Sequence, residues 1–276
     1  MDAGESSPCG AVATSSARTC QCEAMGRLRR WMLVGGAGAA AAALGAGIAA
    51  PSASTLPSHA LGVPARVGPP PGVPSSCRVP HSALHGRSRA LGLPNHGRLA
   101  NGIPFPQETD YSFTWDFPLG LSPNPQWRRY GSEKLVLTLE CVLSAYNAAH
   151  PNLARVGVAD LSRRGGGPFG ARYGGLGHSS HQNGLDADVL YPRKDLCECA
   201  PDSPNDVDVA RAQELIDRFV RAGAQYLFVS PALYRRHLLR GPPNIVIPLA
   251  FHDDHVHVRI YPDRAPRQPT SGPERG

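Results

Sequence analysis

The run from His255 to Tyr261 reads His-Val-His-Val-Arg-Ile-Tyr. Polar and apolar residues alternate along it, and successive side chains of a β-strand point to opposite faces of a sheet. In a strand over this run, His255, His257 and Arg259 share one face, while the valines and the isoleucine share the other. We expect the apolar face to pack into a core and the polar face to line a site.

A second stretch with the same residue types spans residues 178–188 and reads His-Ser-Ser-His-Gln-Asn-Gly-Leu-Asp-Ala-Asp. It ends in a predicted strand in which Asp186 and Asp188 share one face. Gly184 lies just before this strand, and a glycine permits the sharp turn that would bring His181 back toward Asp188. The two stretches together therefore offer imidazole and carboxylate groups that converge.

The converging set is His181, Asp188 and His257. Two imidazoles and one carboxylate are the ligand count of a catalytic zinc site, which keeps a fourth position open for water, whereas structural zinc sites are closed by four protein ligands. Zinc lowers the pKa of a bound water and polarises a carbonyl group. The set therefore predicts metal-assisted hydrolysis.

Each residue also has an ordinary structural explanation. An isolated histidine is commonly a surface or core residue, and Asp186 or Asp253 could simply cap a turn. The competing chemistry is a serine nucleophile, Ser179 or Ser180 beside His178, but the sequence lacks the Gly-x-Ser-x-Gly turn that presents such a serine. The density of ligand residue types in two short stretches favours a metal.

The surrounding chain predicts an α+β fold. Apolar residues at helical spacing predict helices over Glu133–Ala149 and Asp208–Ala222, and Gly223 caps the second. Short runs of branched or aromatic residues predict strands at Val156–Asp160, Leu185–Leu190, Tyr226–Val229, Ile245–Pro248 and His255–Tyr261. We expect a small antiparallel sheet with flanking helices, and the zinc site on that sheet.

The remaining sequence divides by composition. Three arginines between Arg27 and Arg30 precede an apolar run from Trp31 to Ala50, which is the layout of an export signal or, if retained, of a membrane anchor. A stretch rich in Pro, Gly and Ser follows and predicts a linker. The expected segments are 1–24, a non-native or unstructured extension; 25–53, the signal peptide or membrane anchor; 54–90, the linker; 91–262, the zinc domain; and 263–276, a disordered tail.

The net charge and the cysteines bear on the binding partners and the redox compartment of the protein. The formal net charge of +6 comes mostly from scattered arginines and favours polyanionic partners without choosing among nucleic acid, anionic lipid and a charged cell wall. Four cysteines lie beyond the leader, an even number that suits an oxidising compartment. Their three pairings stay open, although close spacing disfavours a bridge between Cys197 and Cys199, and zinc binding by that pair is a weaker alternative. The other two are Cys77 and Cys141.

Several motifs resemble those of the penicillin-insensitive murein endopeptidases, a family grouped with lysostaphin-type and D-Ala-D-Ala metallopeptidases in one zinc superfamily. The resemblance covers about residues 92–262, with order and spacing in agreement. The motifs are Asp160-Leu-Ser162 followed by the glycines of 165–167, His178-x-x-His181-Gln-x-Gly-Leu-Asp-x-Asp188, Phe228-Val-Ser-Pro231, and His252-x-Asp-His255-x-His257-Val-Arg259.

The resemblance implies a role for each residue of these motifs. His181, Asp188 and His257 would bind the catalytic zinc, and His255 would act beside it as general base or as donor to the developing oxyanion. His178 and His252 would join a second metal site or shape the substrate pocket. For a second metal the sequence offers carboxylates at Asp206 and Asp208 but no convincing histidine, so one zinc is expected. Arg259 would hold a substrate carboxylate or form a surface ion pair.

The activity implied by the resemblance is zinc-dependent hydrolysis of peptidoglycan cross-links, of the type between D-alanine and diaminopimelate. The alternatives are a D,D- or L,D-carboxypeptidase or dipeptidase of the same superfamily, and a non-catalytic zinc-stabilised module that binds the wall. We expect the protein in the periplasm or cell wall, with peptidoglycan stem peptides as partners and no nucleic acid. A membrane would be contacted only through an uncleaved N-terminal segment.

Overall fold

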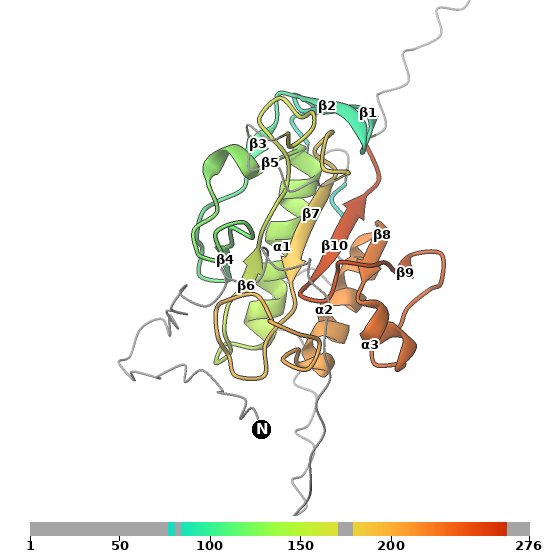
Figure 1. The fold of residues 1–276 in the computed structure, drawn as a ribbon. Helices are drawn as coiled ribbons and strands as arrows, with labels where there is room; N and C mark the ends of the chain where they lie inside the picture. The colour runs from blue at the N-terminus through green and yellow to red at the C-terminus, as the bar shows by residue number, and fades with distance from the viewer. Residues whose placement is uncertain (1–76, 81–83, 171–178, 264–276) are drawn as a thin grey trace, which may run out of the picture. The chain divides into compact units, whose positions relative to one another are not determined.

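A computed structural model describes residues 77–80, 84–170 and 179–263, all of which belong to one unit (Figure 1). The predicted extension 1–24 and the predicted leader 25–53 lie outside the described residues, as do most of the predicted linker and tail. His178 also lies outside them. The part of the chain that is described contains the other predicted site residues.

The main sheet has six strands in the order β4-β6-β7-β10-β8-β9. The middle pairings are antiparallel, whereas β4 pairs with β6 and β8 with β9 in parallel. Helices α1 and α3 make these parallel connections, because a parallel pair needs a crossover. The predicted α+β fold is therefore confirmed, with a mixed sheet. Its strands are β4 Ser112–Thr114, β6 Val156–Val158, β7 Asp186–Leu190, β8 Ala224–Val229, β9 Val246–Pro248 and β10 His255–Ile260.

Both predicted helices are present. Helix α1 spans Glu133–Ala149, and the Ser132 side chain caps it by accepting a hydrogen bond from the Leu135 amide. Helix α2 spans Val209–Ala222 and ends at Gly223, which adopts a left-handed conformation with φ of 86°. A short helix, α3, spans Pro231–Arg235. The spacing of apolar residues thus located the two long helices to within one residue.

The two long helices cover one face of the sheet, as Figure 1 shows. Side chains on that face are apolar and fully buried, among them Ala187 and Val189 of β7 and Val256 and Val258 of β10. The polar residues between them in sequence point to the opposite face. The alternation in the sequence therefore sorted these two strands into a core face and a site face.

Several small elements were not predicted. The strands β1, Arg89–Leu93, and β2, His96–Ala100, form a hairpin whose residues are largely exposed, so they carry little hydrophobic pattern. The hairpin contacts the loop that carries His181, because the Gln182 amide donates to the Pro94 carbonyl at 2.9 Å. The other elements that were not predicted are β3 Ile103–Pro104, β4, β5 Tyr130–Gly131, the 3-10 helix Gln126–Arg128 and α3.

Residues before the hairpin are fastened to the helices. Cys77 is buried and forms a disulfide with Cys141 of α1. The side chain of Arg78 donates to the carbonyl of Arg221 at 3.2 Å, near the end of α2. His85 contacts Glu133, the first residue of α1, through both its backbone amide and its ring. Cys77, Arg78 and His85 therefore pack along the helical layer.

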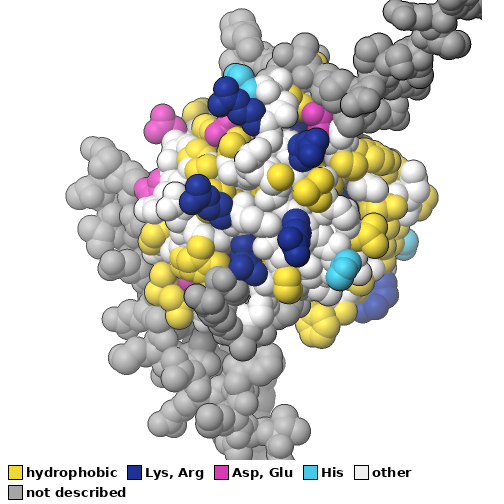
Figure 2. Space-filling view, turned by 90° about the horizontal axis from the view of Figure 1, so that it is seen from above, with side chains coloured by type: hydrophobic (Ala, Val, Ile, Leu, Met, Phe, Trp, Pro, Cys, Tyr) yellow, Lys and Arg dark blue, Asp and Glu magenta, His cyan; other side chains and the backbone are white. Residues whose placement is uncertain are grey.

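Surface charge is dispersed. On the face shown in Figure 2, the dark-blue Lys and Arg side chains stand apart from one another among uncharged ones, which agrees with the scattered arginines of the sequence. Among the residues that the structure describes, no helix has the length and apolar character needed to cross a membrane.

The disulfide closes a loop of 64 residues. We predict that the double variant Cys77→Ser/Cys141→Ser loses about 4 kcal/mol of unfolding free energy, because the cross-link restricts the unfolded chain. Urea unfolding of the wild type, of each single variant and of the double variant measures this. The single variants should lose as much as the double variant. Equal stability of the wild type and the double variant would contradict the prediction.

Candidate metal centre

The site is built on the pairing of β7 with β10. In this antiparallel pair, His257 lies opposite Asp188 and Arg259 lies opposite Asp186. All four side chains point away from the helices, since the intervening residues fill the core. Strand pairing alone therefore places an imidazole beside a carboxylate on the face of the sheet opposite the helices.

A turn before β7 brings the third residue to them. His181 is fully buried and has a φ of 66°, and Gly184 follows with a φ of 74°. A side chain at Gly184 would also collide, since a Cβ there would lie 2.7 Å from a methyl carbon of Leu99. Only glycine tolerates both conditions. The sharp turn expected at this glycine is present, and it returns His181 toward Asp188.

The three side chains converge on one oxygen. Asp188 Oδ1 lies 3.4 Å from His181 Nε2 and 3.0 Å from His257 Nδ1. One ligand atom from each residue lies within 4.8 Å of the other two. Donor atoms bonded at about 2.1 Å to one tetrahedral ion lie roughly 3.4 Å apart. Two imidazole nitrogens and a carboxylate oxygen at this spacing fit a zinc-sized cation.

Asp188 is held in the ionised form that a metal requires. Its side chain is fully buried, and burial alone would raise its pKa. The neighbouring His181 and His255 imidazoles outweigh this and hold the pKa of Asp188 well below its usual range. The carboxylate is therefore ready to accept a cation at neutral pH.

Asp186 stands behind His257. His257 Nε2 donates to Asp186 Oδ1 at 2.8 Å, which leaves Nδ1 as the nitrogen that faces Asp188. Burial would raise the pKa of Asp186, but the hydrogen bond from His257 and nearby positive charges lower it to about 2. Arg259 Nε donates to the same oxygen at 2.6 Å. The structure thus places Arg259 in an ion pair within the site.

His255 lies at the edge of the converging set. Its Nε2 is 3.5 Å from Asp188 Oδ1, and its Nδ1 is 2.7 Å from the Asp254 carboxylate. The ring also packs against Phe117, with centroids 5.1 Å apart. One ring nitrogen is therefore oriented by a carboxylate while the other faces the three ligand candidates.

His252 packs beside His255, with ring centroids 4.9 Å apart. Its Nδ1 donates to the carbonyls of Ala250 and Leu249 at 2.8 and 3.1 Å. Burial, followed by the charge of His255, lowers the pKa of His252 to about 4, so this ring is neutral at pH 7. Its position is that of a residue that shapes the site.

The carboxylates considered for a second metal have local roles. Asp206 accepts hydrogen bonds from the amide and hydroxyl of Ser203. Asp208 caps α2 by accepting from the Arg211 amide. His178, the remaining candidate, lies outside the described residues. Among the described residues, the side chains around Asp188 therefore offer a position for one metal ion.

Comparison with known proteins matches part of the chain to a family model. Residues 124–219 match the family model of penicillin-insensitive murein endopeptidases. The match covers about a third of the chain. No curated protein matches the chain. The murein endopeptidase match supports a peptidase that acts on peptidoglycan at the cell wall. It includes His181 and Asp188 and ends before β10, so the pairing of β10 with β7 is what adds His255 and His257 to the matched region.

Sequence reasoning missed part of the support beneath Asp188. The Asp188 amide donates to the Asp160 carbonyl at 2.9 Å, and the Asp160 side chain forms a buried ion pair with Arg128. The Arg128 guanidinium lies 5.1 Å from the ring centre of Trp127. Asp160 occurs in a motif of the murein endopeptidases, but no spacing in the sequence links it to an arginine 32 residues away.

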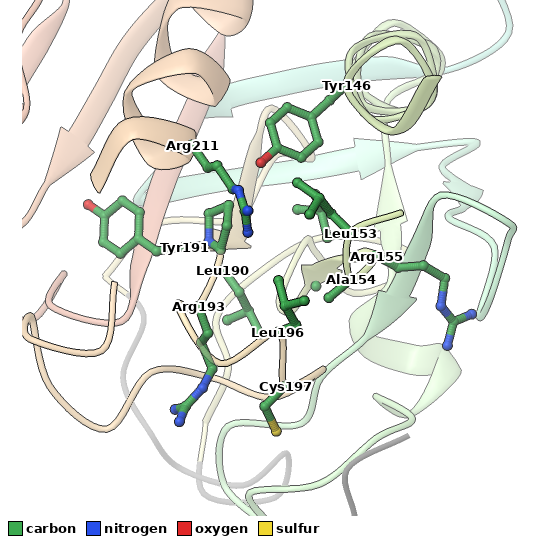
Figure 3. A pocket seen from close by; sticks show the side chains of 13 residues that line it. Tyr146, Leu153, Ala154, Arg155, Leu190, Tyr191, Arg193, Leu196, Cys197 and Arg211 are labelled. Carbon is green, nitrogen blue, oxygen red and sulfur yellow. The ribbon is translucent and has the colours of Figure 1, made fainter. Parts of the chain in front are cut away.

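A separate hollow lies where α1 and β7 end (Figure 3). None of the residues of the converging set lines it. Its arginines are engaged locally: Arg155 pairs with Glu198, and Arg193 pairs with Asp195. Tyr146 and Leu190 contribute to its wall. Among the described residues, the metal-ligand side chains converge around Asp188 rather than in this hollow.

The contact between Asp186 and His257 is open to a direct test. Asp186→Asn should weaken zinc binding about 10- to 100-fold, because it removes the carboxylate that orients the ligand imidazole. Competition with a chromophoric chelator measures the affinity. Asp195→Asn, which changes an exposed carboxylate in an ion pair elsewhere, is the matched control and should bind zinc normally. An unchanged affinity in Asp186→Asn would refute the orienting role.

Proposed function

We propose that the protein is an exported zinc metallo-endopeptidase that hydrolyses peptide cross-links in peptidoglycan. The observation that carries the proposal is the convergence of His181 and His257 on Asp188, with His255 at its edge. The family match of the region that contains His181 and Asp188 supports peptidoglycan as the substrate.

In this proposal His181, Asp188 and His257 hold one zinc ion. When bound, zinc supplies a Lewis acid that activates water and polarises the scissile carbonyl. Three protein ligands leave a coordination position for substrate or water, as in catalytic zinc sites. The donor types and their spacing support this assignment.

His255 supplies the proton transfers. Its Nδ1 is fixed by Asp254, so its Nε2 is the nitrogen available on the side of the ligand set. That nitrogen takes a proton from the attacking water and returns it to the amine of the leaving peptide. The tilted packing of Phe117 against the ring helps to hold its position. His255 is therefore the catalytic residue, and His252 shapes the pocket beside it.

The bond we assign is the cross-link between D-alanine and the side-chain amine of diaminopimelate. Hydrolysis by an activated water uses no nucleophilic side chain and forms no acyl-enzyme. A β-lactam, which inhibits by acylating such a side chain, therefore has no group to react with. Export is inferred from the basic and apolar N-terminal pattern, and it agrees with a substrate that lies outside the cytoplasm. A second zinc, bound through His178 or His252, is not part of the proposal.

Digestion of purified cross-linked muropeptides tests the reaction. We expect mass spectrometry to show dimers converted to monomers, no conversion after chelation, and recovery with stoichiometric zinc. Loss of only a terminal alanine would instead identify a carboxypeptidase. Zinc binding with no hydrolysis of any muropeptide would identify a non-catalytic wall-binding module.

Replacing the proposed base separates catalysis from metal binding. His255→Ala should retain zinc but lose about 100- to 10,000-fold in kcat, the usual contribution of a positioned general base. Stoichiometry by elemental analysis and turnover of the cross-linked dimer are the two readouts. The control is His96→Ala, an exposed histidine of the β1–β2 hairpin. Turnover of His255→Ala at the rate of the control would exclude His255 as the base.

A further inference from the structure

Exposed apolar side chains lie on both loops that contact His255. On one side Phe117 packs against the His255 ring, and Leu119 and Leu121 follow with 62% and 41% of their surface exposed. This loop is closed by backbone hydrogen bonds between Asp116 and Leu121. Two leucines are therefore presented to solvent from a fixed turn beside the site.

The loop before β10 presents an even more exposed group. Phe251 is 94% exposed and immediately precedes His252, whose ring packs against His255. Leu249, two residues earlier, is 45% exposed. We name Leu119, Leu121, Leu249 and Phe251 the apolar rim. The rim residues belong to the two loops whose Phe117 and His252 rings contact His255.

The backbone of Phe251 is strained, since its φ of 67° is unfavourable for a bulky residue. The strain is enforced, because the His252 ring donates to the carbonyls of Leu249 and Ala250 and the Leu249 amide donates to the Val229 carbonyl. A ring that is almost fully exposed contributes little to the core. A strained and almost fully exposed aromatic residue next to a residue of the site is typical of a functional contact.

We infer that Phe251, with the rest of the apolar rim, binds the aliphatic part of the peptide stem that flanks the scissile amide. This rests on the proposed function. Stem peptides offer alanine methyl groups and the methylene chain of the diamino acid. Burial of such groups against a phenyl ring and leucine side chains is favourable without any charge. The rim residues carry none.

Position favours the peptide over the glycan strand. Phe251 is one residue, about 3.8 Å along the backbone, from His252. A cross-link lies several residues from the sugar, and an extended peptide spans about 3.3 Å or more per residue. Groups within reach of Phe251 are therefore the residues next to the bond that is cut. Phe251 is a specificity-determining residue in this assignment.

The test uses two substrates, intact sacculi and a sugar-free cross-linked tetrapeptide dimer. Phe251→Ala should raise KM about tenfold on both substrates with little change in kcat, because it removes binding shared by ground state and transition state. The KM of Phe251→Leu should lie between that of the wild type and that of Phe251→Ala. The matched control is Leu93→Ala, which truncates a 63% exposed apolar residue at the end of β1, outside the apolar rim, and should leave KM unchanged. An unchanged KM on the dimer, or an increase confined to sacculi, would overturn the assignment.

Stability gives a second readout. A purely structural role predicts a lower Tm for Phe251→Gly, whereas relief of the positive φ predicts a Tm equal to or above that of the wild type. Sedimentation with sacculi under chelation, where no hydrolysis occurs, keeps the inference separate from the proposed reaction. If the wild type binds sacculi better than Phe251→Ala but cleaves no dimer, the proposed function is refuted and the binding role of the apolar rim stands. If both proteins bind sacculi equally, the binding role of the apolar rim is refuted.

Discussion

The antiparallel register of β7 and β10 is the constraint on which the site depends. It sets His257 opposite Asp188 and Arg259 opposite Asp186. Because side chains alternate along a strand, a slip of one residue would turn the valines of β10 toward the site and the histidines into the helical layer. The core valines, which are fully buried, therefore fix the register and the positions of the proposed metal ligands together. Stability and function rest on the same pairing.

Burial of charge on this sheet follows from the same register. Asp186 and Asp188 are both fully buried, and a buried carboxylate is costly unless positive groups compensate it. His257 contacts both carboxylates, and Arg259 contacts Asp186. Asp188 lies among the imidazoles of His181, His255 and His257. A divalent cation held between these groups would add to the compensation of its charge.

Short-range sequence patterns predicted the two long helices, the face of β10 that carries the site residues and the turn before β7. Alternation in β10 identified the face of His255, His257 and Arg259, and a glycine before β7 identified the turn at His181. Contacts made across the sequence were less accessible. Nothing in the spacing predicted that Cys77 would bond to Cys141, or that Arg259 would pair with Asp186 rather than point toward a substrate carboxylate. The hairpin of β1 and β2 was missed because exposed strands lack a hydrophobic period.

We expect a single zinc ion to bind to His181, Asp188 and His257. Crystals of the zinc-loaded protein, measured on both sides of the zinc absorption edge, locate the ion directly by its anomalous difference density. We expect one strong anomalous peak within bonding distance of those three side chains and none at Cys197 and Cys199. A peak at the cysteines with no density beside Asp188 would contradict it.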